Sequence, residues 1–82
     1  RKARGLKLGA REILFSKGDP GDRLYLVAKG RVRVGVVSAE GREVTYALIG
    51  PGQMFGEIAV LDGGERTADA TAVEPSELLA FE

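Results

Sequence analysis

The residues best suited to chemistry lie in one short stretch, F-G-E-I-A-V-L-D-G-G-E-R-T-A-D-A, at positions 55–70. Arg66 is the only cation in that stretch. The carboxylates around it are Glu57, Asp62, Glu65, Asp69 and Glu74. A planar guanidinium can donate two parallel hydrogen bonds to a phosphate. A lone arginine in an otherwise acidic half of the chain is therefore a candidate for binding an anion.

Residues 56–61, G-E-I-A-V-L, form the one segment whose pattern favours a helix. Ile58 and Leu61 are three positions apart, and the run ends at Asp62-Gly63-Gly64. We expect about one and a half turns, which is too short to be stable alone in water. The first turn of a helix leaves backbone N–H groups unpaired and carries a partial positive charge, so it attracts an anion.

The polar residues at the two ends of this segment suggest a nucleotide-like ligand. A side chain at Gly56 would obstruct an approaching ligand, and Arg66 can reach the same place from beyond the helix. Thr67 adds a hydroxyl donor. Glu57 would repel a phosphate but can accept hydrogen bonds from a sugar hydroxyl. These residues describe a site for one phosphate carrying a ribose, although they equally allow Glu57 and Arg66 to pair and close a surface turn.

Strands are predicted to position this stretch, because side-chain character alternates with a period of two residues along most of the chain. This alternation is found in the runs 23–29, 31–37, 44–49 and 78–81, and in the alanines at 68, 70 and 72. Twelve glycines cluster at turn signals between the runs, where positive φ is accessible to them. Short strands with frequent turns predict an all-β sandwich or barrel. The segments 31–38 and 43–49, joined through Glu40-Gly41, are the best candidate for a hairpin.

The composition excludes several functional classes. The chain has 82 residues, enough for one small domain spanning 1–82, and contains no cysteine and no histidine. Thiolate zinc sites, disulfides and Ser-His or Cys-His nucleophiles are therefore excluded. No apolar run approaches the ~20 residues of a membrane helix. Residues 1–33 hold ten of the twelve Lys and Arg residues, but without interleaved aromatic residues, so a solvated face is favoured over nucleic-acid binding.

The string F-G-E-I-A-V-L followed by R-T-A, with Arg66 nine residues after Glu57, resembles the phosphate-binding cassette of cyclic nucleotide-binding domains. The runs 18–34 and 49–57 also resemble that family, and the resemblance covers about residues 8–82. It implies a β-roll or jelly-roll barrel of about eight short antiparallel strands, with one short cassette helix. Members of the family occur in catabolite-activator-type transcription factors, cyclic-nucleotide-dependent kinase subunits and channels.

The resemblance also implies seven ligand-binding residues, all in or just after the cassette: Gly56, Glu57, Ile58, Ala59, Arg66, Thr67 and Ala68. The backbone of Gly56, Ile58 and Ala59 is expected to face the cyclic phosphate, which Arg66 neutralises. Glu57 is expected to accept the ribose 2′-hydroxyl. Thr67 is expected beside the phosphate and purine, and Ala68 at the pocket wall. The ligand is then cyclic AMP or cyclic GMP, with no metal or other cofactor.

By the same resemblance, we expect a cytoplasmic regulatory domain and not an enzyme, and a bacterial transcription regulator as the parent protein. The family's flanking helices lie outside residues 1–82, so the chain is expected to be a fragment. The parent is then a homodimer that contacts DNA through a further domain, while this segment itself contacts neither nucleic acid nor membrane. Two alternatives stay open: a ligand-free structural or interaction module, and the regulatory domain of a kinase or channel.

Overall fold

The computed structural model describes residues 3–21, 23–56 and 64–81, and within them the fold is all-β. This confirms the predicted fold class and the expectation of about eight short antiparallel strands. The predicted helix at 56–61 lies outside the described residues except for Gly56. The strands are β1 (Ala3–Leu8), β2 (Ile13–Phe15), β3 (Leu24–Lys29), β4 (Val32–Val37), β5 (Glu43–Ile49), β6 (Met54–Phe55), β7 (Asp69–Ala72) and β8 (Ser76–Phe81).

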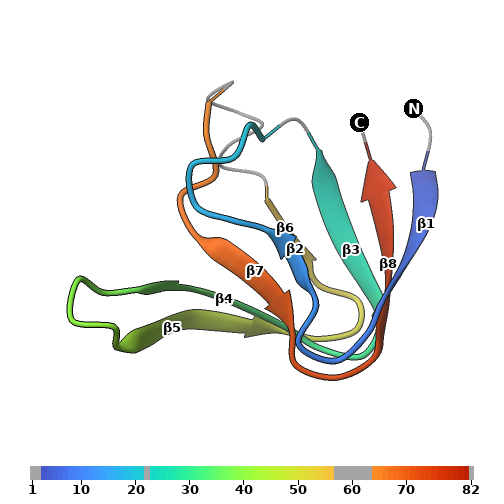
Figure 1. Ribbon diagram of the computed structural model, residues 1–82. Helices are drawn as coiled ribbons and strands as arrows, with labels where there is room; N and C mark the ends of the chain where they lie inside the picture. The colour runs from blue at the N-terminus through green and yellow to red at the C-terminus, as the bar shows by residue number, and fades with distance from the viewer. Residues whose placement is uncertain (1–2, 22, 57–63, 82) are drawn as a thin grey trace.

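The strands form two four-stranded sheets. One has the order β1-β8-β3-β6 and the other the order β2-β7-β4-β5, and neighbouring strands are antiparallel throughout. Figure 1 shows β1, β8 and β3 on one side and β7, β4 and β5 on the other, with the two marked chain ends next to each other beside β1 and β8. Residues 13–15 and 54–55 form edge strands of different sheets, and the rings of Phe15 and Phe55 bring these two edges together, with centroids 6.1 Å apart.

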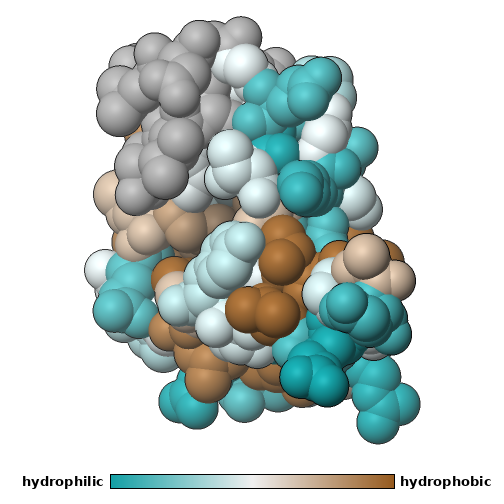
Figure 2. Space-filling model, turned by 90° about the vertical axis from the view of Figure 1, so that its left-hand side faces the viewer, coloured by the Kyte–Doolittle hydropathy of each residue, from teal (hydrophilic) through white to brown (hydrophobic). Residues whose placement is uncertain are grey.

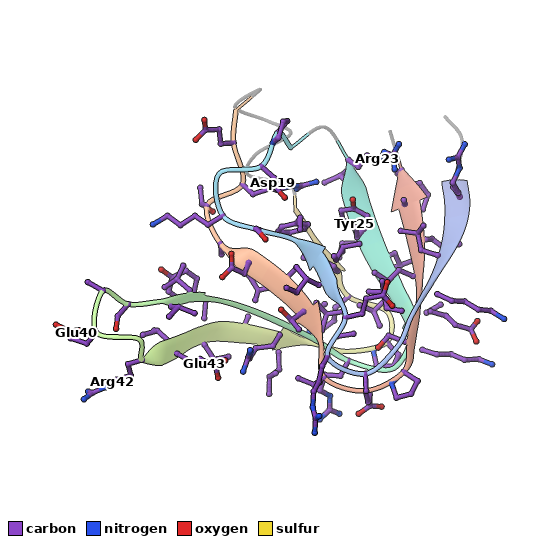
Figure 3. The ribbon with its side chains drawn as sticks, in the orientation of Figure 1. Asp19, Arg23, Tyr25, Glu40, Arg42 and Glu43 are labelled. Atoms are coloured by element: carbon purple, nitrogen blue, oxygen red, sulfur yellow. The ribbon has the colours of Figure 1, made fainter. Side chains whose placement is uncertain are left out.

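The predicted hairpin is confirmed as β4 and β5. Its pairing runs from Val32↔Ile49 to Val37↔Glu43, with a bulge between Val34 and Gly35. The turn closes through a hydrogen bond from the Ser38 N–H to the Arg42 carbonyl, at 2.7 Å. The hairpin extends away from the rest of the domain in Figure 3, where the labelled side chains of residues 40 and 42 lie at its tip.

Alternation along the strands builds a core of small and medium side chains. Tyr25 and Val27 of β3 are buried, whereas their neighbours Leu24 and Leu26 are only partly covered. The predicted alanine face is also confirmed, because Ala68, Ala70 and Ala72 are all buried. Such small residues let the two sheets approach closely. The other buried apolar residues are Leu8, Val32, Phe55, Leu78 and Ala80.

The turn between β3 and β4 contacts the turn between β7 and β8. Ser76 is buried, and its hydroxyl accepts from the Arg31 N–H at 3.1 Å and donates to the Glu74 carbonyl at 2.8 Å. Gly30 has φ +90°, and a Cβ there would lie 2.6 Å from the Pro75 carbonyl oxygen. The two turns are therefore in direct contact and depend on the absence of a side chain at Gly30.

Several large apolar side chains remain at the surface. Tyr46 is 61% exposed, Leu48 53% and Met54 49%, on β5 and β6. Figure 2, viewed from the side of the β4–β5 hairpin, shows apolar residues gathered in the middle of this face with hydrophilic residues around them. Among the described residues, no helix is long and apolar enough to cross a membrane.

Candidate functional site

The turn that follows β2 fixes the backbone of Arg66. The Arg66 N–H donates to the Asp19 carbonyl at 2.7 Å, and the Arg66 carbonyl accepts from the Gly18 N–H at 2.9 Å. An isolated antiparallel bridge joins Pro20 to Glu65. The turn is itself ordered, since the Asp19 carboxylate accepts from the Ser16 N–H at 2.9 Å and Gly18 adopts φ +94°. Residues 17–21, K-G-D-P-G, thus hold the backbone of the residues that follow the cassette.

The side chain of Arg66 points into the protein and is only 4% exposed. Nη1 donates to the Gly56 carbonyl at 3.1 Å, and Nη2 donates to the Arg23 carbonyl at 3.0 Å. The guanidinium carbon lies 4.2 Å from the centroid of the Phe15 ring and 5.5 Å from that of Tyr25. Figure 3 shows Arg23 at the start of β3, with Tyr25 further along the same strand.

No described carboxylate forms an ion pair with Arg66. Its Nε is buried and has no hydrogen-bond partner within residues 3–21, 23–56 and 64–81. Buried charges in proteins are normally paired. Within the described part of the chain, the positive charge is instead surrounded by two carbonyl oxygens and two aromatic rings, and Nε has no acceptor there.

The structure gives Gly56 a second role besides the one predicted from the sequence. The sequence suggested that its small size leaves room for an approaching ligand. A Cβ at this position would lie 2.8 Å from Arg66 Nη1 and 3.1 Å from the Arg23 carbonyl oxygen, and φ is +94°. The space beside Gly56 is therefore occupied by the arginine itself, and glycine is needed for that contact as well as for the backbone conformation.

A cavity of about 280 Å³ opens beside the guanidinium. It brings together four of the seven predicted residues, and Arg66 is the only charged residue that lines it among those described. The lining residues are Phe15, Val34, Tyr46, Ala47, Ile49, Met54, Phe55, Gly56, Arg66, Thr67 and Ala68. A mostly apolar cavity with one charged group is typical of small-ligand sites.

The remaining candidates, Glu57, Ile58 and Ala59, lie outside the described residues. The structure also adds residues that the sequence reasoning missed, namely Phe15, Tyr25 and the carbonyl of Arg23. No local pattern marks them as site residues. The available signal was the position of Tyr25 near the start of the predicted strand 23–29; Phe15 lies outside every predicted strand.

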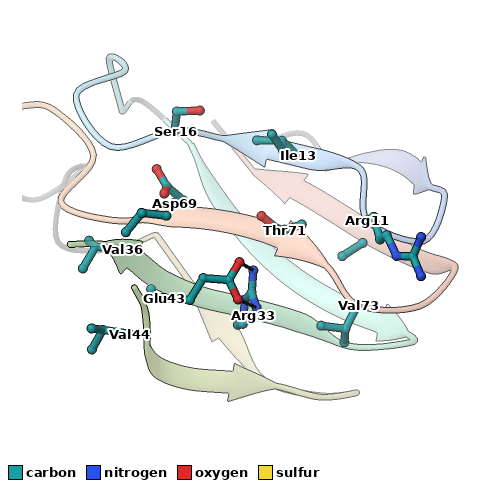
Figure 4. A pocket seen from close by; sticks show the side chains of 13 residues that line it. Arg11, Ile13, Ser16, Arg33, Val36, Glu43, Val44, Asp69, Thr71 and Val73 are labelled. Atoms are coloured by element: carbon teal, nitrogen blue, oxygen red, sulfur yellow. Dashed lines mark hydrogen bonds and ion pairs between the residues drawn. The ribbon is translucent and has the colours of Figure 1, made fainter. Parts of the chain in front are cut away.

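A second, larger cavity of about 580 Å³ contains none of the predicted ligand-binding residues. It is a groove along β2, β7 and β4 (Figure 4). The charged residues Arg33 and Glu43 face each other there and form two hydrogen bonds, at 2.8 and 3.1 Å. Arg33 and Glu43 satisfy each other, and Arg11 and Asp69 bring one further charge of each sign to this groove. Arg66 is the only charged residue among the described residues that line the smaller cavity, which is therefore the better candidate for an anion site.

Comparison with known families identifies the class of protein to which this fold and cavity belong. Residues 6–82 match the cyclic nucleotide-binding domain family, and the chain belongs to that family. The resemblance noted in the sequence is thereby confirmed.

Among curated relatives, the cyclic AMP receptor protein of Thermus thermophilus is 55% identical over 68 residues, covering 83% of this chain and 32% of that protein. The CRP-like cAMP-activated global transcriptional regulator of Mycobacterium tuberculosis is 43% identical over 60 residues, covering 73% and 27%. A putative potassium channel protein of Rhodopseudomonas palustris is 35% identical over 82 residues, covering 99% and 19%. The chain thus spans about a third or less of the length of these relatives.

Solved structures share the fold. The Thermus thermophilus catabolite activator protein has a TM-score of 0.89 at 47% identity, covering 96% of this chain and 37% of that one. The cAMP-bound form of the EAL enzyme Bd1971 has a TM-score of 0.88 at 32% identity, covering 94% and 21%. This fold therefore occurs both in a catabolite activator protein and in an EAL enzyme.

Proposed function

We propose that this domain binds a 3′,5′-cyclic nucleotide, with cyclic AMP as the preferred ligand, in the cavity beside Arg66. The observation that carries the proposal is the convergence of Gly56, Arg66, Thr67 and Ala68 on one cavity. Arg66 has no carboxylate partner among the described residues, which supports an anion as the ligand. The family and the relatives named as cyclic AMP-dependent regulators support the choice of ligand.

The seven residues predicted from the cassette remain the proposed contacts. Arg66 is proposed to neutralise the cyclic phosphate together with the backbone of Gly56, Ile58 and Ala59, while Glu57 accepts the ribose 2′-hydroxyl. Thr67 is exposed at the cavity and can donate its hydroxyl to the ligand, and Ala68 is buried in the wall. Cyclic GMP shares the phosphate and ribose, so it is expected to compete for the same cavity.

Isothermal titration calorimetry with cyclic AMP tests the proposal. Arg66→Gln removes a charge-assisted hydrogen bond of about 1.5–3 kcal/mol, so the dissociation constant should rise about 10- to 150-fold. Arg33→Gln is the matched control, because Arg33 is also hydrogen-bonded through both terminal nitrogens but lines only the larger groove. Unchanged affinity in Arg66→Gln, with native circular dichroism, contradicts the proposed site.

A ligand-free structural module is the second candidate, and one observation favours it. Two donors of Arg66 are already bonded to backbone carbonyls, so the residue contributes to the fold without any ligand. Thermal unfolding separates the two functions, because a ligand at 100 times its dissociation constant stabilises the folded state by about 2.7 kcal/mol. A melting temperature that does not move with millimolar cyclic AMP or cyclic GMP favours the structural module.

We propose further that the parent protein is a cytoplasmic bacterial transcription regulator, acting as a homodimer and contacting DNA through another domain. The Thermus and Mycobacterium relatives support this assignment, and the channel relative supports the alternative of a channel regulatory domain. The domain itself is proposed to bind ligand without catalysis. Release of a hydrolysis product from cyclic AMP by the purified domain contradicts that part.

A further inference from the structure

Phe15 provides the aromatic surface closest to the guanidinium of Arg66. It is the last residue of β2, and its ring centroid lies 4.2 Å from the guanidinium carbon, against 5.5 Å for Tyr25. A cation over an aromatic face is attracted by the negative potential of the ring, and the attraction grows when both groups are removed from water. Since Arg66 is only 4% exposed, this contact lies in the stronger range.

The position of the Phe15 ring is set by both sheets. It lies 5.9 Å from the ring of Tyr25 in β3 and 6.1 Å from that of Phe55 in β6, and these two rings stack at 5.4 Å. β2 belongs to one sheet, whereas β3 and β6 belong to the other. The three rings therefore form a packed support whose geometry does not depend on a ligand.

The contacts of Arg66 divide into two kinds with different geometric effects. The hydrogen bonds to the Gly56 and Arg23 carbonyls involve N–H groups that lie in the guanidinium plane. They fix rotation within that plane but restrain tilting out of it only weakly. The Phe15 ring lies with its face toward the guanidinium carbon, 4.2 Å from the ring centroid, and so restrains displacement of the guanidinium toward the ring. The ring also partly balances a charge for which no described carboxylate is available.

We propose that Phe15 is a positioning residue for anion binding, holding the guanidinium of Arg66 in its binding orientation before a ligand arrives. The proposal rests on the proposed function of the cavity and adds to it the residue that sets affinity through Arg66. Holding a binding group in place in the free protein reduces the ordering cost of complex formation. Phe15 thus raises the affinity for the ligand through Arg66, without a polar contact of its own.

Fluorination of the Phe15 ring tests this role while nearly preserving the shape of the side chain. Site-specific replacement by 4-fluoro-, 3,5-difluoro- and 3,4,5-trifluorophenylalanine progressively weakens the negative potential of the ring face. The affinity for cyclic AMP, measured by calorimetry, should fall stepwise, by about 3- to 30-fold over the series. Phe81 is the control, because it lies in β8 and does not line the cavity. An affinity that stays flat across the Phe15 series overturns the proposal.

A second measurement needs no ligand. In the free domain, the Arg66 Nε–H resonance should be shifted upfield by the Phe15 ring current, lose that shift in Phe15→Leu and regain it in Phe15→Trp. A resonance that is insensitive to Phe15 overturns the positioning role. If the unmodified domain binds no cyclic nucleotide while the resonance responds to Phe15, the proposed function fails and the Phe15–Arg66 contact stands.

Discussion

Arg66 carries a positive charge into the interior of a small domain, where its described partners are neutral. Carbonyl dipoles and ring faces stabilise a guanidinium less than a carboxylate does, so the described residues alone do not neutralise its charge. An anion that reaches such a cation gains more than it would at an exposed arginine, because less water screens the pair. The burial of Arg66 is therefore consistent with a binding group that is ready before its ligand is present.

Gly56 offers a test of how closely Arg66 is packed. Gly56→Ala should destabilise the domain by about 1–2 kcal/mol through its positive φ and also displace Nη1, which lies 2.8 Å from the added Cβ. Affinity for cyclic AMP should then fall at least about tenfold, the effect of weakening one charge-assisted hydrogen bond. Chemical denaturation and calorimetry measure the two effects.

Gly18→Ala is the matched control for that substitution. Gly18 has the same φ, +94°, but a Cβ there meets no atom within 4 Å. It should show a similar φ-related loss of stability while keeping its affinity. Equal loss of affinity in the two variants would mean that backbone strain, and not displacement of Arg66, is responsible.

At the residue scale, the sequence predicted which polar residues converge but not how deeply they lie. Gly56, Arg66, Thr67 and Ala68 share a cavity as expected. An arginine in a G-E-R-T segment after two glycines is typical of an exposed turn, and the burial of Arg66 comes from strands distant in sequence. Phe15 is 51 positions before Arg66, and no local periodicity encodes that contact.

At the scale of elements, long alternating strands could be predicted and short or irregular ones could not. The hairpin of β4 and β5 follows directly from V-R-V patterning and a glycine turn. β1 contains Gly5 and two cations, and β6 has only two residues, so neither shows a sustained period of two. They form because neighbouring strands supply their hydrogen bonds: β8 for β1, and β3 for β6.

The contact between the turns at Gly30 and Ser76 should contribute strongly to stability. Ser76→Ala leaves the Arg31 N–H without its buried acceptor, which should cost about 1–3 kcal/mol of unfolding free energy. The matched variant is Ser38→Ala, whose hydroxyl accepts from the Arg42 N–H in the exposed hairpin turn and should cost about 0.5 kcal/mol or less. Urea denaturation of both variants provides the comparison, and equal losses would contradict the importance of the buried contact.

At the scale of the whole molecule, the domain exposes several large apolar side chains to solvent. Ile13, Val37, Tyr46, Leu48 and Met54 are each about half exposed or more. Exposed apolar surface favours association between protein molecules. The exposed residues on β5 lie on a strand at the edge of its sheet, where backbone groups are also available for pairing.

The isolated domain is therefore expected to self-associate at high concentration, as measured by sedimentation velocity over a concentration series. Leu48→Lys should reduce the associated fraction, because it replaces a half-exposed apolar side chain of β5 by a charged one. Ala28→Lys adds the same charge at an exposed position of β3 without removing a large apolar group, and should have a smaller effect. A domain that stays monomeric across the series would contradict this expectation.

The pairing of β1 with β8 has a mechanical consequence. The two strands are antiparallel, with Ala3 opposite Phe81 at one end and Leu8 opposite Ser76 at the other. Figure 1 shows the two chain ends side by side at the Ala3–Phe81 end. Tension applied to both ends would load the inter-strand bonds one after another, as in a zipper, and not all at once in shear. The first sheet should then peel open under low force while the second sheet, with β4 and β5, carries almost none of it.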